Sequence, residues 1–213
     1  IQVLREELQE IADKYGDDRL TEIETVDDEI DIEDLIEEED CCFTLSEAGY
    51  IKRMPASTYR AQRRGGRGVN GQNLKDEDYV KTLLVASSHD YLLFFTNKGR
   101  VHRRKGYQIA EAGRTARGTA IVNILPLEPD ERVSAMLTTR EFTEDYLMMV
   151  TRNGTVKRLS LPSLFTARKA GIRAITLDEG DELISVFKTN SDSNVILATR
   201  MGQAICFAAE DVR

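Results

Sequence analysis

The sequence predicts an all-β, propeller-like body made of repeated units and preceded by a short helix. A strand–turn–strand pattern occurs four times, with a glycine in each tight turn, at Gly49, Gly99, Gly154 and Gly202. These glycines are 50, 55 and 48 residues apart. A unit of about 50 residues with roughly four strands has the size of a propeller blade. Because no long helical pattern lies between the strands, an α/β fold is disfavoured.

The four hairpins share one layout of apolar strand, glycine turn and second strand. They are Phe43–Arg53, Phe95–Arg103, Val150–Arg158 and Ala198–Cys206. A further strand opens after an acidic segment in three places, at Asp76–Val80, Pro129–Val133 and Gly180–Ile184. The longest spacing contains extra residues of loop composition around Thr139–Thr143. Residues 41–213 therefore hold three full units and part of a fourth.

A basic loop recurs at a matching place in three units. The chain gives Arg64–Gly68, Arg114–Gly118 and Ala167–Gly171, whose last glycines lie 19, 19 and 17 residues after the turn glycines. The first copy contains the most arginine and glycine residues and extends back to Gln62. Guanidinium groups fork onto phosphate oxygens, and glycine lets backbone N–H groups approach the same anion. Loops at equivalent places in successive units project from the same rim, so the sequence predicts a row of cations that binds a bent DNA duplex. The first loop alone also fits a solvated, flexible linker.

The candidate DNA-binding residues come from these loops and from the second hairpin strands. They are Gln62, Arg63, Arg64, Gly65, Gly66, Arg67, Gly68, Lys52, Arg53, Arg103, Arg104, Lys105, Arg114, Arg117, Lys157, Arg158, Arg168 and Lys169. Alternation along a strand means that they cannot all face one surface. Each one alone also fits an ordinary solvated side chain, but the set favours DNA.

The charge is divided unevenly along the chain. The net charge is −8, yet residues 1–41 carry 18 acidic and 3 basic side chains, whereas residues 42–213 carry 19 acidic and 26 basic ones. An acidic leader therefore precedes a body with a net charge of +7. The body decides which partners the chain prefers.

The leader is expected to hold a helix and a linker. Apolar residues from Leu4 to Tyr15 recur at helical spacing, and Gly16 follows as a left-handed cap, so residues 1–16 are either the end of a longer helix or an ordinary N-terminal helix. Residues 17–40 read as an acidic linker that becomes an edge strand near Ile30 and Ile32. No EF-hand spacing supports a divalent-cation site there. This segment is also a candidate competitor of DNA for the basic body.

Other features restrict the class of protein. Cys41, Cys42 and Cys206 form no CxxC motif and are expected to be small buried hydrophobic residues rather than metal ligands. No apolar stretch approaches the length of a membrane span, and the first residues lack a signal-peptide pattern. These observations favour a soluble intracellular protein.

The basic loop and its surroundings resemble one family. The run Gln62–Gly68 is similar to the gyrase box of DNA gyrase A subunits, which are type IIA topoisomerases, and topoisomerase IV subunits carry only a degraded form of it. The resemblance extends over essentially the whole chain. Lys14–Arg19 resembles the end of that subunit's long arm helix, which implies that residues 1–16 are the end of this helix. The other similar segments are Gly49–Pro55, Thr58–Arg60, Arg114–Gly118 and Glu179–Ile184.

The resemblance implies the C-terminal DNA-wrapping domain, a β-pinwheel whose units exchange strands and whose rim bends duplex DNA chirally to support ATP-dependent negative supercoiling. It implies no catalytic residue, metal or cofactor in this segment, because the family's nucleophilic tyrosine lies upstream and the holoenzyme uses ATP and Mg²⁺ through other domains. The implied partners are double-stranded DNA and the gyrase B subunit in an A2B2 assembly. The implied location is the bacterial cytoplasm, at the nucleoid.

Three alternatives remain at this level. A propeller can be a protein-interaction scaffold, but aromatic anchors are few and Trp is absent. The equivalent domain of topoisomerase IV is the second alternative, and RGG-type RNA binding is the third. The repeat also places the next loop glycine beyond Arg213, which predicts an open edge able to pair with another copy.

Overall fold

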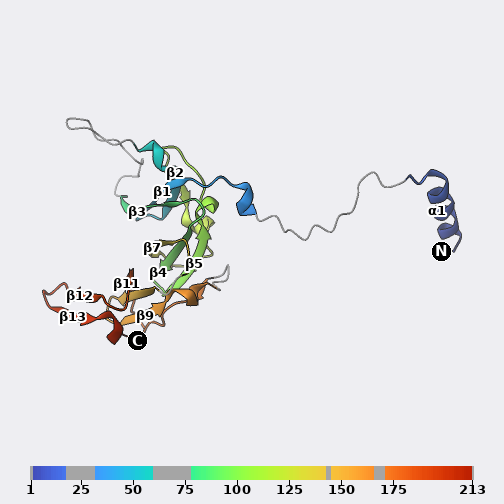
Figure 1. Cartoon of the computed structure of the whole chain (residues 1–213). Helices are drawn as coiled ribbons and strands as arrows, with labels where there is room; N and C mark the ends of the chain where they lie inside the picture. The colour runs from blue at the N-terminus through green and yellow to red at the C-terminus, as the bar shows by residue number, and fades with distance from the viewer. Residues whose placement is uncertain (1, 18–31, 60–77, 143–144, 166–170, 213) are drawn as a thin grey trace. The chain divides into compact units, whose positions relative to one another are not determined.

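The structure, a computed structural model, describes residues 2–17, 32–59, 78–142, 145–165 and 171–212 (Figure 1). It divides into two compact units, Ile1–Leu35 and Ile36–Arg213. Helix α1 in the first unit spans Gln2–Tyr15, as the apolar spacing predicts.

Two details of the leader differ from the prediction. Gly16 follows α1, but it does not adopt a positive φ; its amide donates to the Ala12 carbonyl oxygen at 2.8 Å. Ile32–Leu35 form a 3-10 turn, η1, so Ile32 is not in the expected edge strand, and Ile30 lies outside the described residues. The short acidic run Glu33–Asp34 opens this turn, where carboxylates favour the free N–H groups.

The four predicted hairpins are confirmed in the second unit. Their strands are β1 (Asp40–Ser46) and β2 (Tyr50–Pro55), β4 (Tyr91–Thr96) and β5 (Arg100–Lys105), β8 (Tyr146–Thr151) and β9 (Val156–Ser160), and β12 (Asn194–Ala198) and β13 (Ala204–Ala208). All four are antiparallel. The turn glycines have φ of +81°, +73°, +92° and +82° in chain order, which is the left-handed region that these turns need.

A longer strand pairs with the first strand of each of three hairpins. β3 (Val80–Ser87) pairs with β1, β7 (Val133–Thr139) with β4, and β11 (Leu183–Thr189) with β8, always antiparallel. Each of these strands begins after one of the predicted acidic segments. It therefore closes its own sheet and leads the chain to the next hairpin.

Two very short strands are exchanged between neighbouring sheets. β6 (Thr119–Ala120) follows the second hairpin but pairs with β2 of the first sheet. β10 (Ile172–Arg173) follows the third hairpin but pairs with β5 of the second sheet. The sheet orders are β3-β1-β2-β6, β10-β5-β4-β7, β11-β8-β9 and β12-β13. This exchange is the β-pinwheel arrangement, so the all-β, blade-repeat prediction is confirmed.

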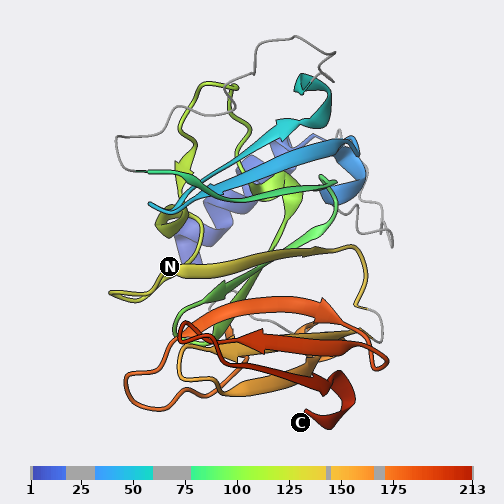
Figure 2. The ribbon, with the colours of Figure 1, turned by 90° about the vertical axis from the view of Figure 1, so that its left-hand side faces the viewer.

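The hydrophobic core lies between consecutive sheets. Figure 2 shows the sheets following one another in chain order, from β1 in blue to β13 in red. The strand β4 is buried on both faces: Leu92 and Phe94 pack in the cluster with the first sheet, and Leu93 and Phe95 in the cluster with the third. A smaller cluster around Val195 joins the third sheet to β12 and β13. Each sheet thus depends on its neighbours for burial.

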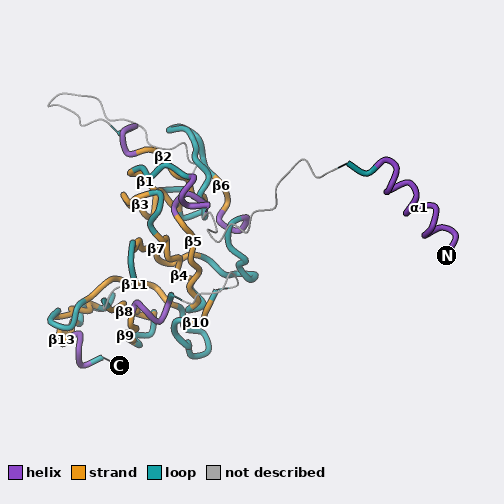
Figure 3. Tube along the Cα trace, turned by 45° about the vertical axis from the view of Figure 1, so that its right-hand side comes forward, coloured by secondary structure: helices purple, strands orange, loops and turns teal. Residues whose placement is uncertain are grey.

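Short 3-10 turns follow the second or exchanged strands (Figure 3). They are η2 (Ala56–Thr58), η3 (Gly106–Gln108), η4 (Ile121–Asn123), η5 (Leu161–Leu164) and η6 (Ala209–Asp211). They contribute buried residues, including Ile121 and Leu161, to the clusters between sheets. None of the helices that the structure describes is long and apolar enough to cross a membrane.

The cysteines do not all follow the prediction. Cys41 and Cys42 are buried on opposite faces of β1, and burial raises the pKa of both thiols. The prediction for Cys206 is wrong, because this residue is exposed. It lies on β13, in a sheet where the described part of the chain places only two strands.

A carboxylate anchors each of the first three hairpin turns. Ala48 donates its backbone N–H to Asp78 Oδ1 at 3.0 Å, and Asn153 donates to Asp181 Oδ1 at 3.0 Å. In the second hairpin the Thr96 hydroxyl donates to Glu131 Oε1 at 2.6 Å. A hydrogen bond from the Thr151 hydroxyl is the main cause that lowers the pKa of Asp181. The predicted acidic segments therefore connect each hairpin to the start of the next strand, β3, β7 or β11, by hydrogen bonds.

Candidate nucleic-acid interface

The second basic loop is part of a segment that runs along β2. Before the loop, the Arg53 N–H donates to the Ala110 carbonyl at 3.2 Å, and the Ala112 N–H donates to the Arg53 carbonyl at 3.1 Å. After the loop, Thr119 and Ala120 in β6 pair with β2. Between these two attachments the chain leaves the strand over residues 113–117, which we call loop 113–117.

Loop 113–117 presents two guanidinium groups. Arg114 and Arg117 are both exposed. The Arg117 guanidinium carbon lies 5.3 Å from the ring centroid of Tyr50, the first residue of β2. The attraction between a cation and an aromatic face restrains the position of this guanidinium. These two residues have the exposure that the predicted phosphate contacts need.

The glycine that ends the loop is required by its surroundings. Gly118 has a φ of +95°, and a Cβ placed there would lie 2.4 Å from the Ile51 carbonyl oxygen. Gly171 ends the third basic loop with a φ of +77°, and a Cβ there would lie 2.6 Å from the His102 ring. Both glycines immediately precede an exchanged strand. Both positions therefore need glycine, at the points where the chain meets the neighbouring sheet.

Lys52 lies beneath this loop instead of at the surface. Its side chain is fully buried, and its ammonium donates to the carbonyl oxygens of Gly113, Arg114 and Ala116 at 3.3, 2.8 and 3.1 Å. Burial lowers the pKa of this lysine. In this position it supports the loop and does not face a DNA backbone.

Arg53, next to Lys52, is held by carboxylates. Its guanidinium lies 2.6 Å from Glu39 Oε1 and 3.6 Å from Glu111 Oε2, and it donates to the Ile109 carbonyl at 3.3 Å. Only 14% of its side chain is exposed. These contacts fix the start of the segment that carries loop 113–117.

Arg103, the matching residue of the second hairpin, is surrounded by aromatic rings. Its guanidinium carbon lies 4.9, 5.6 and 5.4 Å from the ring centroids of Tyr91, Phe142 and Phe165, and it donates to the Phe165 carbonyl. Lys105 lies 3.9 Å from the Tyr91 centroid. This cluster holds the chain just before the third basic loop.

The other predicted strand cations are also partly buried. Arg104 donates to the Ile124 carbonyl at 3.0 Å, and burial lowers its pKa. Lys157 donates to the Ala174 carbonyl at 2.7 Å, and the Arg158 guanidinium lies 4.3 Å from the Tyr146 centroid.

The predicted residues therefore fall into three groups. Arg114 and Arg117 share one exposed loop, whereas the cations of the second hairpin strands bind carbonyls, carboxylates or aromatic rings. The remaining candidates lie outside the described residues: Gln62, Arg63, Arg64, Gly65, Gly66, Arg67, Gly68, Arg168 and Lys169. Contact of any of these residues with DNA stays a prediction.

Two features of the interface were not found from the sequence. Tyr50, Tyr91 and Tyr146 each open a strand and lie against a cation. The repeated Asp-Tyr pairs at residues 90–91 and 145–146 were a signal for two of them. Arg140 is exposed and bound by Glu38, a pairing across 102 residues that no local pattern predicts.

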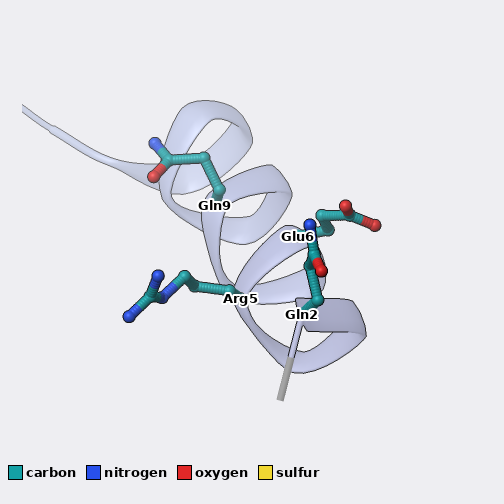
Figure 4. A pocket seen from close by; sticks show the side chains of 4 residues that line it. All are labelled: Gln2, Arg5, Glu6 and Gln9. Carbon is teal, nitrogen blue, oxygen red and sulfur yellow. The ribbon is translucent and has the colours of Figure 1, made fainter.

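The described residues contain no cluster of three His, Cys, Asp or Glu side chains that could hold a metal ion. A shallow hollow on α1 is lined by Gln2, Arg5, Glu6 and Gln9, and Figure 4 shows that Arg5 and Glu6 project to different sides of the helix. These groups do not converge, so the hollow carries no catalytic arrangement.

Comparisons with known proteins agree with this architecture. A family profile described as the DNA gyrase C-terminal domain, beta-propeller, matches residues 42–87, 90–140 and 145–190. The DNA gyrase A subunit of Halalkalibacterium halodurans is 49% identical over 214 residues, covering 100% of this chain and 26% of that protein. The chain spans about a quarter of the length of the curated relatives it matches.

Two solved structures have the same fold. One is described as the structure of a DNA gyrase A C-terminal domain, with a TM-score of 0.64 and 27% identity over 82% of this chain and 56% of that one. The other is the C-terminal domain of a DNA topoisomerase IV, with a TM-score of 0.68 and 28% identity over 81% of this chain and 53% of that one.

Proposed function

The chain belongs to the DNA gyrase C-terminal domain family, and from this premise we propose that it binds duplex DNA and bends it chirally around its rim. The observation that carries the proposal is loop 113–117, which exposes Arg114 and Arg117 at a position that the repeat predicts once per sheet. Successive loops of this kind supply regularly placed cations for a backbone whose charge is regular and independent of sequence. The work of bending, about 1–6 kcal/mol for 40–90° over 20–30 bp, calls for several such contacts.

We propose the first basic loop, Gln62–Gly68, as the point where DNA is fastened, with loop 113–117 and Arg168 and Lys169 guiding it onward. The strand cations from Lys52 to Arg158 contribute mainly by supporting these loops. In the whole protein, this wrapping presents a DNA segment for ATP-dependent negative supercoiling.

The wider setting is also proposed. The relatives are DNA gyrase A subunits, which supports a partnership with a B subunit in an A2B2 assembly through upstream domains, with ATP and Mg²⁺ used there. It also supports a place at the nucleoid in the bacterial cytoplasm. Self-association through an open sheet edge of this segment is a further expectation.

A gyrase role fits better than the topoisomerase IV role. Both kinds of solved structure share the fold, but the curated relatives that are 47% and 49% identical over nearly the whole chain are DNA gyrase A subunits, and the first basic loop is complete. The two roles differ in wrapping, so the test below separates them.

The decisive experiment is DNA topology. The chain is bound to nicked circular DNA, the nick is ligated, and the change in linking number is measured. We expect a shift of one sign that disappears when Arg63, Arg64 and Arg67 are all replaced by Ala. A control with Arg5, Lys14 and Arg19 replaced by Ala removes the same charge from the leader and should retain the shift.

No shift with the native loop would contradict wrapping. Binding is measured in parallel as a function of salt, where the logarithm of the binding constant should fall by about 0.9 per phosphate neutralised for each unit of log salt. Steep salt dependence without a linking-number shift would indicate DNA binding without chirality, as expected of a topoisomerase IV-like role.

A further inference from the structure

We propose that Lys52 is a positioning residue that holds loop 113–117 in the shape that presents Arg114 and Arg117 to DNA. The proposal deepens the proposed function and rests on it. Lys52 belongs to the first hairpin, whereas the loop follows the second hairpin, so the contact joins two neighbouring units.

The geometry matches the donors of a lysine to the acceptors of the loop. A protonated amine has three N–H donors, and the structure gives the Lys52 ammonium three carbonyl acceptors at 2.8–3.3 Å. These carbonyls belong to Gly113, Arg114 and Ala116, which are close together in the chain. Turning them toward one buried cation fixes the path of the loop backbone.

The ends of the loop are fixed independently, so Lys52 acts on its middle. The Ala112 N–H bonds to Arg53 on one side, and β6 pairs with Tyr50 and Ile51 on the other. Without the ammonium, all three loop carbonyls would lose this donor, and the Gly113 carbonyl would keep the Ala116 N–H at 3.0 Å. Carbonyls that lose a charged donor gain by turning toward water, so the loop would move toward solvent.

The charge of Lys52 also suits the role. Hydrogen bonds from an ammonium to carbonyl oxygens are stronger than those between neutral groups. Burial lowers the pKa of Lys52, because an ammonium is less well solvated there.

The same offset from the turn glycine recurs in the next unit. Lys52 is the third residue after Gly49, and His102 is the third after Gly99. His102 is also fully buried, and its ring lies 2.6 Å from where a Cβ on Gly171 would be, at the end of the third basic loop. In the first unit this position contacts the loop through the Lys52 ammonium, and in the next unit it contacts the glycine before the exchanged strand through the His102 ring.

The first test measures how readily a protease cleaves loop 113–117 in the absence of DNA. Lys52→Met keeps most of the side-chain volume but removes the donors, and trypsin cleavage after Arg114 and Arg117 is followed by mass spectrometry. We expect cleavage roughly tenfold faster than in the native chain, because hydrogen bonds that hold the loop closed are lost. Lys157→Met, the matched control at the same offset in the third hairpin, should leave this cleavage rate unchanged.

Folding is checked by urea denaturation, and Lys52→Gln, which keeps an N–H donor group, is the second variant if Lys52→Met does not fold. We expect Lys52→Gln to increase cleavage less than Lys52→Met. Unchanged cleavage in both folded variants would overturn the proposal, whatever the chain does with DNA.

The second test is a double-mutant cycle on DNA affinity. Lys52→Met alone should weaken binding roughly three- to tenfold at about 0.1 M salt. In a chain that already carries Arg114→Ala and Arg117→Ala, it should have almost no further effect, because Lys52 acts through these residues. A full additional loss would show that Lys52 acts elsewhere and would overturn the proposal.

The two readouts separate this inference from the proposed function. If the native chain binds no DNA while Lys52→Met still exposes the loop to trypsin, the proposed function fails and only the structural support by Lys52 remains. If DNA wrapping is present but the cycle is additive, the inference fails alone.

Discussion

At the scale of single residues, side chains of one type have different roles because strand alternation places them differently. Lys52 and Arg53 are adjacent, yet Lys52 donates hydrogen bonds to carbonyls of loop 113–117 and Arg53 forms an ion pair with Glu39. Arg117 lies in a loop, outside the strands, and is exposed. Exposure, and not residue type, therefore selects the cations that can meet a phosphate.

Two glycines, Gly118 and Gly154, allow a test of how tightly the chain packs where a strand is exchanged between sheets. Gly118 and Gly154 have similar φ values of +95° and +92°, but only Gly118 has neighbours within reach of an added Cβ. An alanine at either position meets the same backbone penalty. The difference between the two variants therefore measures the close contact between neighbouring sheets.

We expect Gly154→Ala to lower the free energy of unfolding by about 1–2 kcal/mol, the cost of a left-handed L-residue. Gly118→Ala should cost about 3 kcal/mol, because crowding against the Ile51 carbonyl adds about 1–3 kcal/mol. Urea denaturation of both variants gives the two values. Equal losses would mean that the segment before β6 shifts freely, and that the contact with Ile51 does not constrain it.

At the scale of elements, residues 36–39, which we call the strap, lie just before β1 and bind residues at the ends of β3 and β7. The Ser88 N–H donates to the Glu39 carbonyl at 2.8 Å, and the Glu39 N–H donates to the Ser88 hydroxyl oxygen at 3.1 Å. Glu38 pairs with Arg140, beyond the end of β7, and accepts from the Ser87 hydroxyl at 2.7 Å. The strap therefore ties the start of β1 to the ends of β3 and β7.

Acid should release this strap. The hydrogen bond from Arg140, followed by that from Ser87, lowers the pKa of Glu38 from 4.5 to about 2. A carboxyl whose pKa is lower in the folded state stabilises the fold above its unfolded pKa. That contribution is lost as the pH falls from about 4.5 toward 2.

The measurement is urea denaturation from pH 6 to pH 2 for the native chain and for Glu38→Gln. We expect the variant to lose less stability across this range than the native chain, because its side chain does not titrate. Arg140→Gln, which removes the guanidinium partner of Glu38, should flatten the pH dependence in part, because the hydrogen bond from Ser87 remains. Parallel pH profiles for all three proteins would show that the pair contributes nothing to folding.

At the scale of the whole molecule, the repeat made most of the fold predictable. Turn glycines at matched spacing located the four hairpins, and the acidic segments located β3, β7 and β11. The exchange of β6 and β10 was not predictable from these patterns, because strands of two residues have no periodicity of their own. Only the resemblance to a known family implied it.

The candidate site was predictable in its residue types but not in its geometry. The sequence marked Lys52 and Arg114 equally as phosphate contacts, whereas the fold places one beneath the other. That relation depends on β6 pairing with β2, which brings residues 62 positions apart together. A pattern read within one unit contains no information about such a contact between units.

Because the core lies between sheets, stability should vary along the stack of sheets. β4 is buried on both faces, and Phe94 and Phe95 belong to different clusters. In β12 and β13, Ile196 and Ile205 are 71% and 61% exposed, and a sheet of two strands is marginal by itself. The backbone N–H groups of β12 and β13 should therefore open by local unfolding, and those of β4 only with the whole body.

Hydrogen exchange of the 213-residue chain tests this gradient. We expect amides in β12 and β13 to exchange fastest among the strands and those in β4 slowest. Val195→Ala should accelerate exchange in β12 and β13 and leave β4 unchanged, since Val195 packs only in the third cluster. Phe94→Ala should lower protection throughout by about 3–5 kcal/mol, the usual loss for a buried phenylalanine. If Val195→Ala accelerated β4 as much as β13, the sheets would unfold as one cooperative body, and strand exchange, more than the contacts between faces, would set the stability of each sheet.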